Sequence, residues 1–289
     1  MKNVIINADD FGLTSGINRG IVQAHQNGVL TSASLMANMP GFDEAVLLAK
    51  GNPSLGVGVH LNLIRGRSIL PKKEIPSLVD DDNRFSQSGL SLLSGIITKR
   101  IKLNDIKKEL EAQVNKVIDA GIEPSHLDGE KHSHLLPGIA DITANLAKAK
   151  GIKCIRLINE RITVFNNQAC KCLILNALSK KIAALVKRND LITTDRFFGV
   201  VNTGSMDARA YIEIFNNLSG GSYELMSHPG YVDEELSMLS QESGGYFINK
   251  YREIELNALL DPRLKKIAKD LGIQFINFHD LGRRKNGYQ

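Results

Sequence analysis

The chain has 289 residues, of which 43% are hydrophobic and 23% charged, and these ordinary globular proportions exclude an intrinsically disordered or collagen-like protein. Lys and Arg number 36 against 31 for Asp and Glu, a formal charge of +5. The basic residues are scattered and form no zinc-finger, RNP or helix-turn-helix pattern, so we expect no nucleic-acid partner. The three cysteines are too few for a disulfide framework, no run of about 18 apolar residues predicts a transmembrane segment, and the N-terminus is too polar for a signal peptide. These features predict a cytoplasmic protein.

Short apolar runs alternate with amphipathic stretches along the chain. The first half predicts, in order, a strand at residues 4–8, a helix at 17–27, a strand at 31–37, a helix at 42–50, a strand at 56–63, a loop insertion at 65–89, a helix at 103–120 and a strand at 125–128. The second half predicts a helix at 137–150, a strand at 153–157, a helix at 169–187, strands at 191–194 and 196–201, a helix at 207–217, a strand at 222–226, helices from 250 through 268 and a strand at 274–278. This alternation predicts a mainly parallel sheet with helices outside it, in a single domain spanning residues 1–289.

The strand at residues 56–63 favours a barrel over an open sheet. Its odd positions are all Val or Leu, and its even positions are Gly, Gly, His and Asn. Successive side chains of a strand point to opposite faces, so one face packs on helices and the other is small and then polar. That pattern is typical of a strand that lines a barrel with a polar site at its mouth. We therefore predict an α/β fold, a (β/α) barrel-like domain of a distorted TIM type.

Polar clusters follow the predicted strands. Asp9 and Asp10 come directly after the first strand, where two carboxylates are costly to bury unless they are paired or bind a metal. The alternative, a helix N-cap, suits Thr14 and Ser15 better. His60 ends the third strand with Asn62 on the same face, although a lone strand-end histidine is more often a core residue.

The densest cluster is residues 126–134, which contain three of the seven histidines and two acids. If this segment is extended, its alternate residues Asp128, Glu130, His132 and His134 share one face. The alternative is a charged surface loop, which the apolar neighbours of the segment disfavour.

Two further strand ends carry candidate residues. His228 follows the strand at 222–226 and precedes Pro-Gly, which suits a positioned acid–base group or, alternatively, a turn with an incidental histidine. Arg156 ends the strand at 153–157 and could bind a carboxylate or an oxyanion, or form a structural ion pair. Asp and His ligands with a spare carboxylate beside them describe a metal-hydrolase site.

Four of these segments, in this order, resemble the YdjC-like carbohydrate deacetylases, which include the chito-oligosaccharide and hopanoid-biosynthesis-associated deacetylases. They are Asn-Ala-Asp-Asp-Phe-Gly-Leu, Gly-Val-His-Leu-Asn-Leu, His-Leu-Asp-(x)₃-His-x-His-(x)₂-Pro and Ser-His-Pro-Gly-Tyr, and they span Asn7 to Tyr231. The resemblance implies a (β/α) barrel-like fold and divalent-metal-dependent removal of an acetyl group from an N-acetylated sugar. The implied substrate is an N-acetylglucosamine-type oligosaccharide or glycoconjugate.

The resemblance also implies roles for individual residues. Asp9 corresponds to the general base, Asp10 and His60 to metal ligands, and His228 to the group that protonates the leaving amine. Arg156 resembles the family's strand-end arginine near the site, and we count it as a catalytic residue with Asp9 and His228. We expect the substrate to contact the following residues: Asn62, Asp128 and Tyr231.

Glu130 departs from the family pattern, which has a histidine ligand at this position. Glutamate can also bind a metal, so we expect one divalent ion on Asp10, His60 and Glu130, with His132 or His134 as the alternative third ligand. A second carboxylate makes the ligand set more anionic, which raises the pKa of a bound water and favours Mg²⁺ or Mn²⁺, with Zn²⁺ as another candidate.

Two other functions are consistent with the same residues. One is a metal-dependent phosphoesterase, which predicts a second metal ion. The other is a non-catalytic sugar-binding protein in which Glu130 marks a degraded metal site. A homodimer is expected only by analogy with families of this shape.

Overall fold

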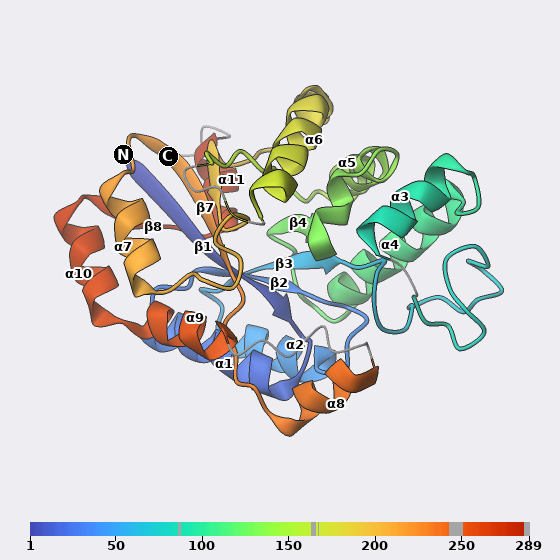
Figure 1. The fold of residues 1–289 in the computed structure, drawn as a ribbon, viewed down its shortest axis with the longest axis horizontal. Coiled ribbons are helices and arrows are strands. Elements are labelled where there is room, and N and C mark those ends of the chain that lie inside the picture. The colour runs from blue at the N-terminus through green and yellow to red at the C-terminus, as the bar shows by residue number, and fades with distance from the viewer. Residues whose placement is uncertain (86–87, 163–165, 167, 243–250, 286–289) are drawn as a thin grey trace.

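A curled sheet of eight parallel strands forms the centre of the protein (Figure 1). The computed structural model describes residues 1–85, 88–162, 166, 168–242 and 251–285. The strand order is β5-β4-β3-β2-β1-β7-β6, and β8 also pairs with β1. The strands are β1 (Lys2–Phe11), β2 (Ser32–Leu35), β3 (Gly56–Leu61), β4 (His126–Gly129), β5 (Cys154–Ile155), β6 (Arg196–Phe198), β7 (Gly221–Ser227) and β8 (Ile273–Phe275).

Strand β1 lies in the middle of the sheet, and all its residues from Val4 to Phe11 are buried. Its first half, Val4–Ile6, is apolar on both faces, as expected for a parallel strand that is covered on both sides. β7 pairs with residues 2–8 along one edge, whereas β8 pairs with residues 2–4 and β2 with residues 7–11. β8 and β2 therefore share the other edge, and the carboxyl end of β1 lies beside β2 and its neighbours.

Helices surround this sheet (Figure 1). They are α1 (Ser15–Asn27), α2 (Phe42–Gly51), α3 (Gly89–Ile97), α4 (Leu103–Asp119), α5 (Ile139–Ala149), α6 (Ala169–Arg188), α7 (Ala208–Asn216), α8 (Glu234–Glu242), α9 (Tyr251–Leu260), α10 (Pro262–Asp270) and α11 (Phe278–Lys285). Caps fix several of their ends: the Thr14 hydroxyl accepts from the N–H of Ile17 at the start of α1, and Asp261 caps α10 ahead of Pro262. Within the described residues, no helix has the length and apolar character needed to span a membrane.

The segment at residues 191–198 connects the two ends of the strand order. Ile192 forms a parallel bridge with Cys154 of β5, and β6 pairs with β7. The sheet thus curls back toward itself, which confirms the predicted α/β, barrel-like fold. The predicted strand at 191–194 is wrong, because only this single bridge forms there, and the strand predicted at 196–201 ends at Phe198.

Residues 65–85 form a loop that carries two isolated antiparallel bridges, Arg67 with Arg84 and Val79 with Phe85. Buried acids of α4 hold this loop. The carboxylate of Glu109 accepts the N–H groups of Ile69 and Leu70 at 2.9 and 3.0 Å. The loop is therefore anchored next to the carboxyl ends of the strands, and it leads into α3, a helix that the sequence did not predict.

Candidate active site

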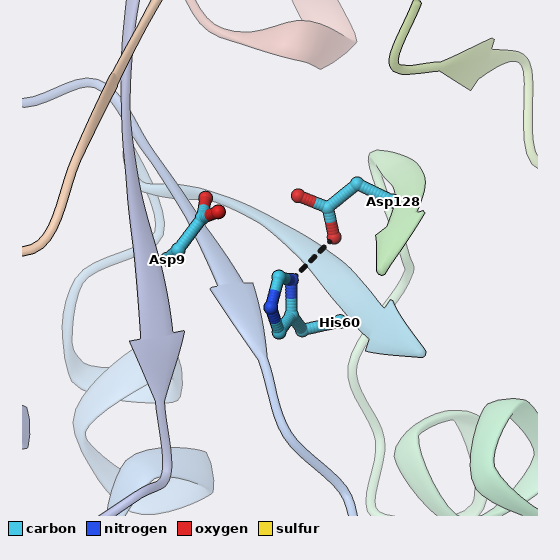
Figure 2. Close-up of side chains that lie close together, drawn as sticks. All are labelled: Asp9, His60 and Asp128. Carbon is cyan, nitrogen blue, oxygen red and sulfur yellow. Dashed lines mark hydrogen bonds and ion pairs between the residues drawn. The ribbon is translucent and has the colours of Figure 1, made fainter. Parts of the chain in front are cut away.

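One cavity of about 220 Å³ lies at the carboxyl ends of β1, β3 and β4. Four buried titratable side chains from these ends line it: Asp9, Asp10, His60 and Glu130. Figure 2 shows Asp9 of β1, His60 of β3 and Asp128 of β4 lying close together, although β2 separates β1 from β3 in the sheet. The cavity is lined by Asp9, Asp10, His60, Arg65, Glu130, Lys131, His132, Lys171, Thr203, Met226, His228 and Arg252. Polar residues that follow three of the predicted strands thus line one cavity.

An irregularity at the end of β1 allows two successive aspartates to reach the same cavity. Neighbouring side chains of a regular strand point to opposite faces. The pairing of β1 with β2 shifts register between Ala8 and Phe11, and Asp10 has a left-handed φ of 70°. Strained backbone of this kind is common at functional sites, and Asp tolerates it better than most residues.

His60 presents one ring nitrogen to each of two carboxylates. Its Nδ1 donates to Asp128 Oδ1 at 2.9 Å (Figure 2), and its Nε2 lies 3.4 Å from Glu130 Oε2. Burial disfavours the charged imidazole, but the Asp128 carboxylate outweighs burial and raises the pKa of His60 well above its usual range. Because Nδ1 is engaged by Asp128, Nε2 is the nitrogen left for a ligand.

Two groups of side chains have the spacing of a metal site, and both contain His60. In each group the candidate ligand atoms lie within 4.8 Å of one another: Asp10, His60 and Glu130, or Asp9, His60 and Asp128. Asp128 already binds the other imidazole nitrogen, Nδ1. A carboxylate in this position is the usual outer partner of a metal-bound histidine. The donor set of Asp10, His60 Nε2 and Glu130 therefore fits a divalent cation, since two carboxylate oxygens and an imidazole suit Mg²⁺, Mn²⁺ or Zn²⁺.

Arg156 is fully buried and binds three carboxylates. Its Nη1 and Nη2 donate to the two oxygens of Asp9 at 2.8 and 2.7 Å. Nη1 also lies 2.7 Å from Asp128 Oδ2, and Nε donates to Glu224 Oε1 at 2.7 Å. Arg156 is not among the residues that line the cavity. Its contacts are those of a buried ion pair, which the sequence analysis gave as the structural alternative, and its predicted catalytic role stays a prediction.

Three carboxylates surround one guanidinium, so negative groups outnumber the positive one, and Glu224 is the carboxyl that takes up a proton most readily. Burial raises the pKa of Glu224 from its usual 4.5 to about 7, although Arg156 opposes this shift. Its second oxygen, Oε2, has no hydrogen-bond partner among the described residues. Burial of Asp128 is outweighed by Arg156, which holds the pKa of Asp128 well below its usual range.

Glu224→Gln should therefore remove a pH dependence of stability. A raised carboxyl pKa stabilises the fold fully below pH 4.5, and this contribution is lost as the pH rises through about 7. The free energy of unfolding of the natural protein should fall relative to the variant by up to about 3 kcal/mol between pH 4.5 and 8, at about 1.4 kcal/mol per pKa unit. Urea unfolding of both proteins at the two pH values measures this difference, and parallel pH profiles would contradict it.

Two arginines that the sequence analysis missed pair with the candidate metal ligands. Arg252 of α9 donates through Nη2 to Asp10 Oδ2 at 2.6 Å, and Arg65 donates through Nη2 to Glu130 Oε1. Burial raises the pKa of both carboxyls, but these arginines outweigh it, so both pKa values lie below their usual range. No local motif marks either arginine, because one lies in the insertion and the other near the far end of the chain.

His228 follows β7 and lies on the cavity wall with 23% of its side chain exposed. Its backbone N–H donates to Glu255 Oε2 at 2.5 Å, and its Nδ1 lies 3.9 Å from the same oxygen. Burial raises the pKa of Glu255. A buried acid on α9 thus fixes the backbone of a partly exposed imidazole.

The segment after β4 does not stay extended, so the prediction of one shared face for residues 128–134 is wrong. Residues Glu130–Leu135 form a 3₁₀ turn in which Lys131 and His132 have left-handed φ values of 51° and 60°. His134 Nε2 instead lies 3.0 Å from the carbonyl oxygen of Arg156. Within the described residues, neither His132 nor His134 belongs to a metal-capable group, so Glu130 is the better third ligand.

The residues predicted to bind substrate are held by internal bonds, and none of them lines the cavity. Asn62 bonds the backbone of Ile64 and Arg65, and Asp128 is fully buried between His60 and Arg156. The Tyr231 hydroxyl donates to Gln23. Substrate contact by these three residues stays a prediction, and it would require side chains whose polar atoms are bonded within the protein.

A protein family and several curated relatives match this chain over almost its whole length. The family model described as YdjC-like protein matches residues 3–270. Carbohydrate deacetylases of Brevibacillus brevis and Geobacillus stearothermophilus are 33% and 32% identical to this chain over 282 and 278 residues. Each alignment covers 96% of this chain, and 99% and 97% of those proteins respectively.

A solved structure from Enterococcus faecalis V583, described as a cellobiose-phosphate cleavage protein, has the same fold. Its TM-score is 0.75 and its identity 26%, with 97% of this chain and 98% of that chain covered. The similarity extends through every strand that contributes to the cavity, since the family match includes all of β1 to β7 except Lys2. The chain belongs to the YdjC-like protein family.

Proposed function

We propose that this protein is a metal-dependent hydrolase that removes the acetyl group from an N-acetylated sugar, an N-acetylglucosamine-type oligosaccharide or glycoconjugate, and releases acetate. The observation that carries the proposal is the cavity in which Asp10, His60 and Glu130 lie within metal-binding distance of one another, with Asp9 on the same wall. The carbohydrate deacetylases among its relatives support the choice of substrate class.

The metal ligands in this proposal are Asp10, His60 Nε2 and Glu130, and Mg²⁺ or Mn²⁺ is the favoured ion. When bound, a divalent ion lowers the pKa of a water and polarises the acetyl carbonyl oxygen. Asp128 fixes the orientation of the His60 ring through Nδ1, and so leaves Nε2 as the nitrogen that would hold the ion.

Asp9 is the proposed general base. Asp9 is 97% buried and lines the cavity together with Asp10. Arg156 holds both of its oxygens, and the amide of Asn7 donates to Oδ1 at 2.9 Å. This bonding keeps Asp9 at one position, from which it accepts the proton of the attacking water. Arg156 acts through Asp9 and is a positioning residue.

His228 is the proposed general acid. It lies on the cavity wall, and its exposure gives the imidazole access to substrate. Donation of a proton to the departing nitrogen turns a poor amide leaving group into a free amine. Glu255 anchors the backbone of His228 and so directs the ring into the cavity.

An acetate-release screen tests the proposal. Chelated protein is supplied separately with Mg²⁺, Mn²⁺, Zn²⁺ and Co²⁺ and incubated with N-acetylated mono- and oligosaccharides, a glycolipid, and phosphorylated disaccharides. Release of acetate and a free amino sugar with at least one metal is the expected result. Phosphate release without acetate would instead identify a phosphoesterase, and sugar binding without any hydrolysis would identify a binding protein.

His228→Gln is expected to lower kcat for N-acetylated sugars by roughly 10²–10⁴-fold, because general acid catalysis contributes about that much. An aryl acetate ester should lose far less activity, because its leaving group needs no proton. The affinity for Mn²⁺ should not change. His279→Gln, which changes a half-buried histidine on α11, is the matched control. Equal losses on both substrates would remove His228 from the role of acid.

A further inference from the structure

The structure assigns Arg65 a role as the positioning residue of Glu130: the two form one unit in which the arginine binds one carboxylate oxygen and leaves the other for the metal. The inference rests on the proposed metal site and adds a determinant to it. Glu130 Oε1 accepts from Arg65 Nη2, and Oε2 lies 3.4 Å from His60 Nε2. The two oxygens of one carboxylate thus face different partners.

Glu130 lies among like charges and needs a counter-ion. Four buried carboxylates surround His60, namely Asp9, Asp10, Asp128 and Glu130. Arg156 pairs with the first and third of these, and Arg252 pairs with the second. Arg65 is the cation whose contact with Glu130 offsets the remaining charge, and a buried carboxylate without such a partner is costly.

The position of Arg65 is built by buried residues and is not an accident of a surface loop. Asn62 is fully buried, its Oδ1 accepts the N–H of Arg65 at 3.2 Å, and its Nδ2 donates to the Arg65 carbonyl oxygen at 2.8 Å. Gln113 of α4 then holds Asn62 itself through the backbone N–H and carbonyl, at 2.9 and 2.7 Å. The Arg65 side chain is only 11% exposed.

Two effects of opposite sign follow for a metal ion. While Glu130 is present, Arg65 orients it as a ligand through one oxygen, and loss of such an outer partner typically weakens metal binding by about 10–100-fold. If Glu130 is made neutral, the Arg65 charge faces the dication directly and only repels it. The same arginine should therefore strengthen binding in one background and weaken it in the other.

A double-mutant cycle on the full-length protein measures this reversal, with the dissociation constant for Mn²⁺ determined by calorimetry. Arg65→Met should weaken Mn²⁺ binding about tenfold or more in the natural protein, by the loss of an outer partner. In a Glu130→Gln background the same change should tighten binding several-fold. Arg67→Met removes an equal charge from the exposed side of the same loop, where Arg67 bonds the Asp82 carbonyl, and should change neither constant.

The outcomes separate this inference from the proposed function. Equal effects of Arg65→Met in both backgrounds would overturn the role of Arg65 and leave the metal site standing. Failure of the natural protein to bind Mn²⁺, Mg²⁺ or Zn²⁺ would overturn the metal site and the inference with it. If Arg65→Met does not fold, Arg65→Lys is the second variant, because it keeps the charge but lacks the planar guanidinium. Arg65→Lys should weaken Mn²⁺ binding in the natural protein and should not tighten it in the Glu130→Gln protein. An unchanged constant for Arg65→Lys in the natural protein would also count against the inference.

Discussion

Asp9→Asn is expected to lower kcat for acetate release by roughly 10²–10⁴-fold while a metal ion remains bound. The amide cannot accept the proton of the attacking water. Its oxygen can still accept from Arg156 Nη2, while the bond from Nη1 to Oδ2 is lost. Arg156 keeps Asp128 and Glu224 as counter-ions, so the fold should be retained. Steady-state kinetics on an N-acetylated sugar and calorimetric titration with Mn²⁺ provide the two measurements. The amide has nearly the same size as the carboxylate, so packing is unchanged.

The control for this prediction is Asp10→Asn, a change at the neighbouring position. Asp10 belongs to the metal-capable group with His60 and Glu130, so its amide variant should lose metal affinity and activity together. Full activity of Asp9→Asn would sink the assignment of the base. Loss of Mn²⁺ binding by Asp9→Asn would indicate that Asp9, His60 and Asp128 form the metal site instead.

Arg156→Met should destabilise the protein by about 3–5 kcal/mol at neutral pH, since removing one partner of a buried ion pair leaves uncompensated charge. Three carboxylates lose their shared cation: Asp9, Asp128 and Glu224. Arg156 keeps the pKa of Asp128 low, and stability from a lowered carboxyl pKa is lost as the pH falls. The destabilisation should therefore shrink toward acidic pH.

Urea unfolding at several pH values checks this result. Arg196→Met is the matched control, because Arg196 is exposed on β6 and makes one 3.3 Å hydrogen bond to Asn159. A surface change of that kind should alter the free energy of unfolding by no more than about 0.5 kcal/mol. Equal stability of Arg156→Met and Arg196→Met would contradict the account of a shared buried cation.

The sequence predicted the part of the site that parallel strands determine. The carboxyl ends of neighbouring parallel strands meet at one edge, so polar residues at the ends of β1, β3 and β4 had to converge. Apolar residues early in β1 and β3, followed by Asp9, Asp10 and His60 near the strand ends, carry that information locally. This is why Asp9, Asp10, His60 and Glu130 could be grouped before the structure was known.

The sequence did not predict what turns and distant contacts determine. The left-handed backbone at Lys131 and His132 ends the extended conformation, so His132 and His134 do not join the metal-capable groups of the described residues, and only glycine marks such a conformation reliably. Arg252 reaches Asp10 across 242 residues of sequence, a separation that no spacing pattern encodes. The side-chain role of Asn62 depends on the loop that follows it and on α4.

These missed arginines change the electrostatic argument about the metal. An extra carboxylate at position 130 alone predicts a more anionic ligand set, a higher pKa for bound water and a preference for Mg²⁺ or Mn²⁺. Arg65 and Arg252 each pair with one ligand carboxylate and offset that charge. Metal preference therefore depends on the arginines as well as on the ligands.

A titration of chelated protein with Mn²⁺ tests the central proposal most directly, with bound metal and acetate release from an N-acetylated oligosaccharide followed in the same samples. The account predicts no acetate release without metal, activity that rises in proportion to occupancy, and saturation at one ion per chain. Full activity in the chelated protein, or activity that appears only with a second ion per chain, would contradict it.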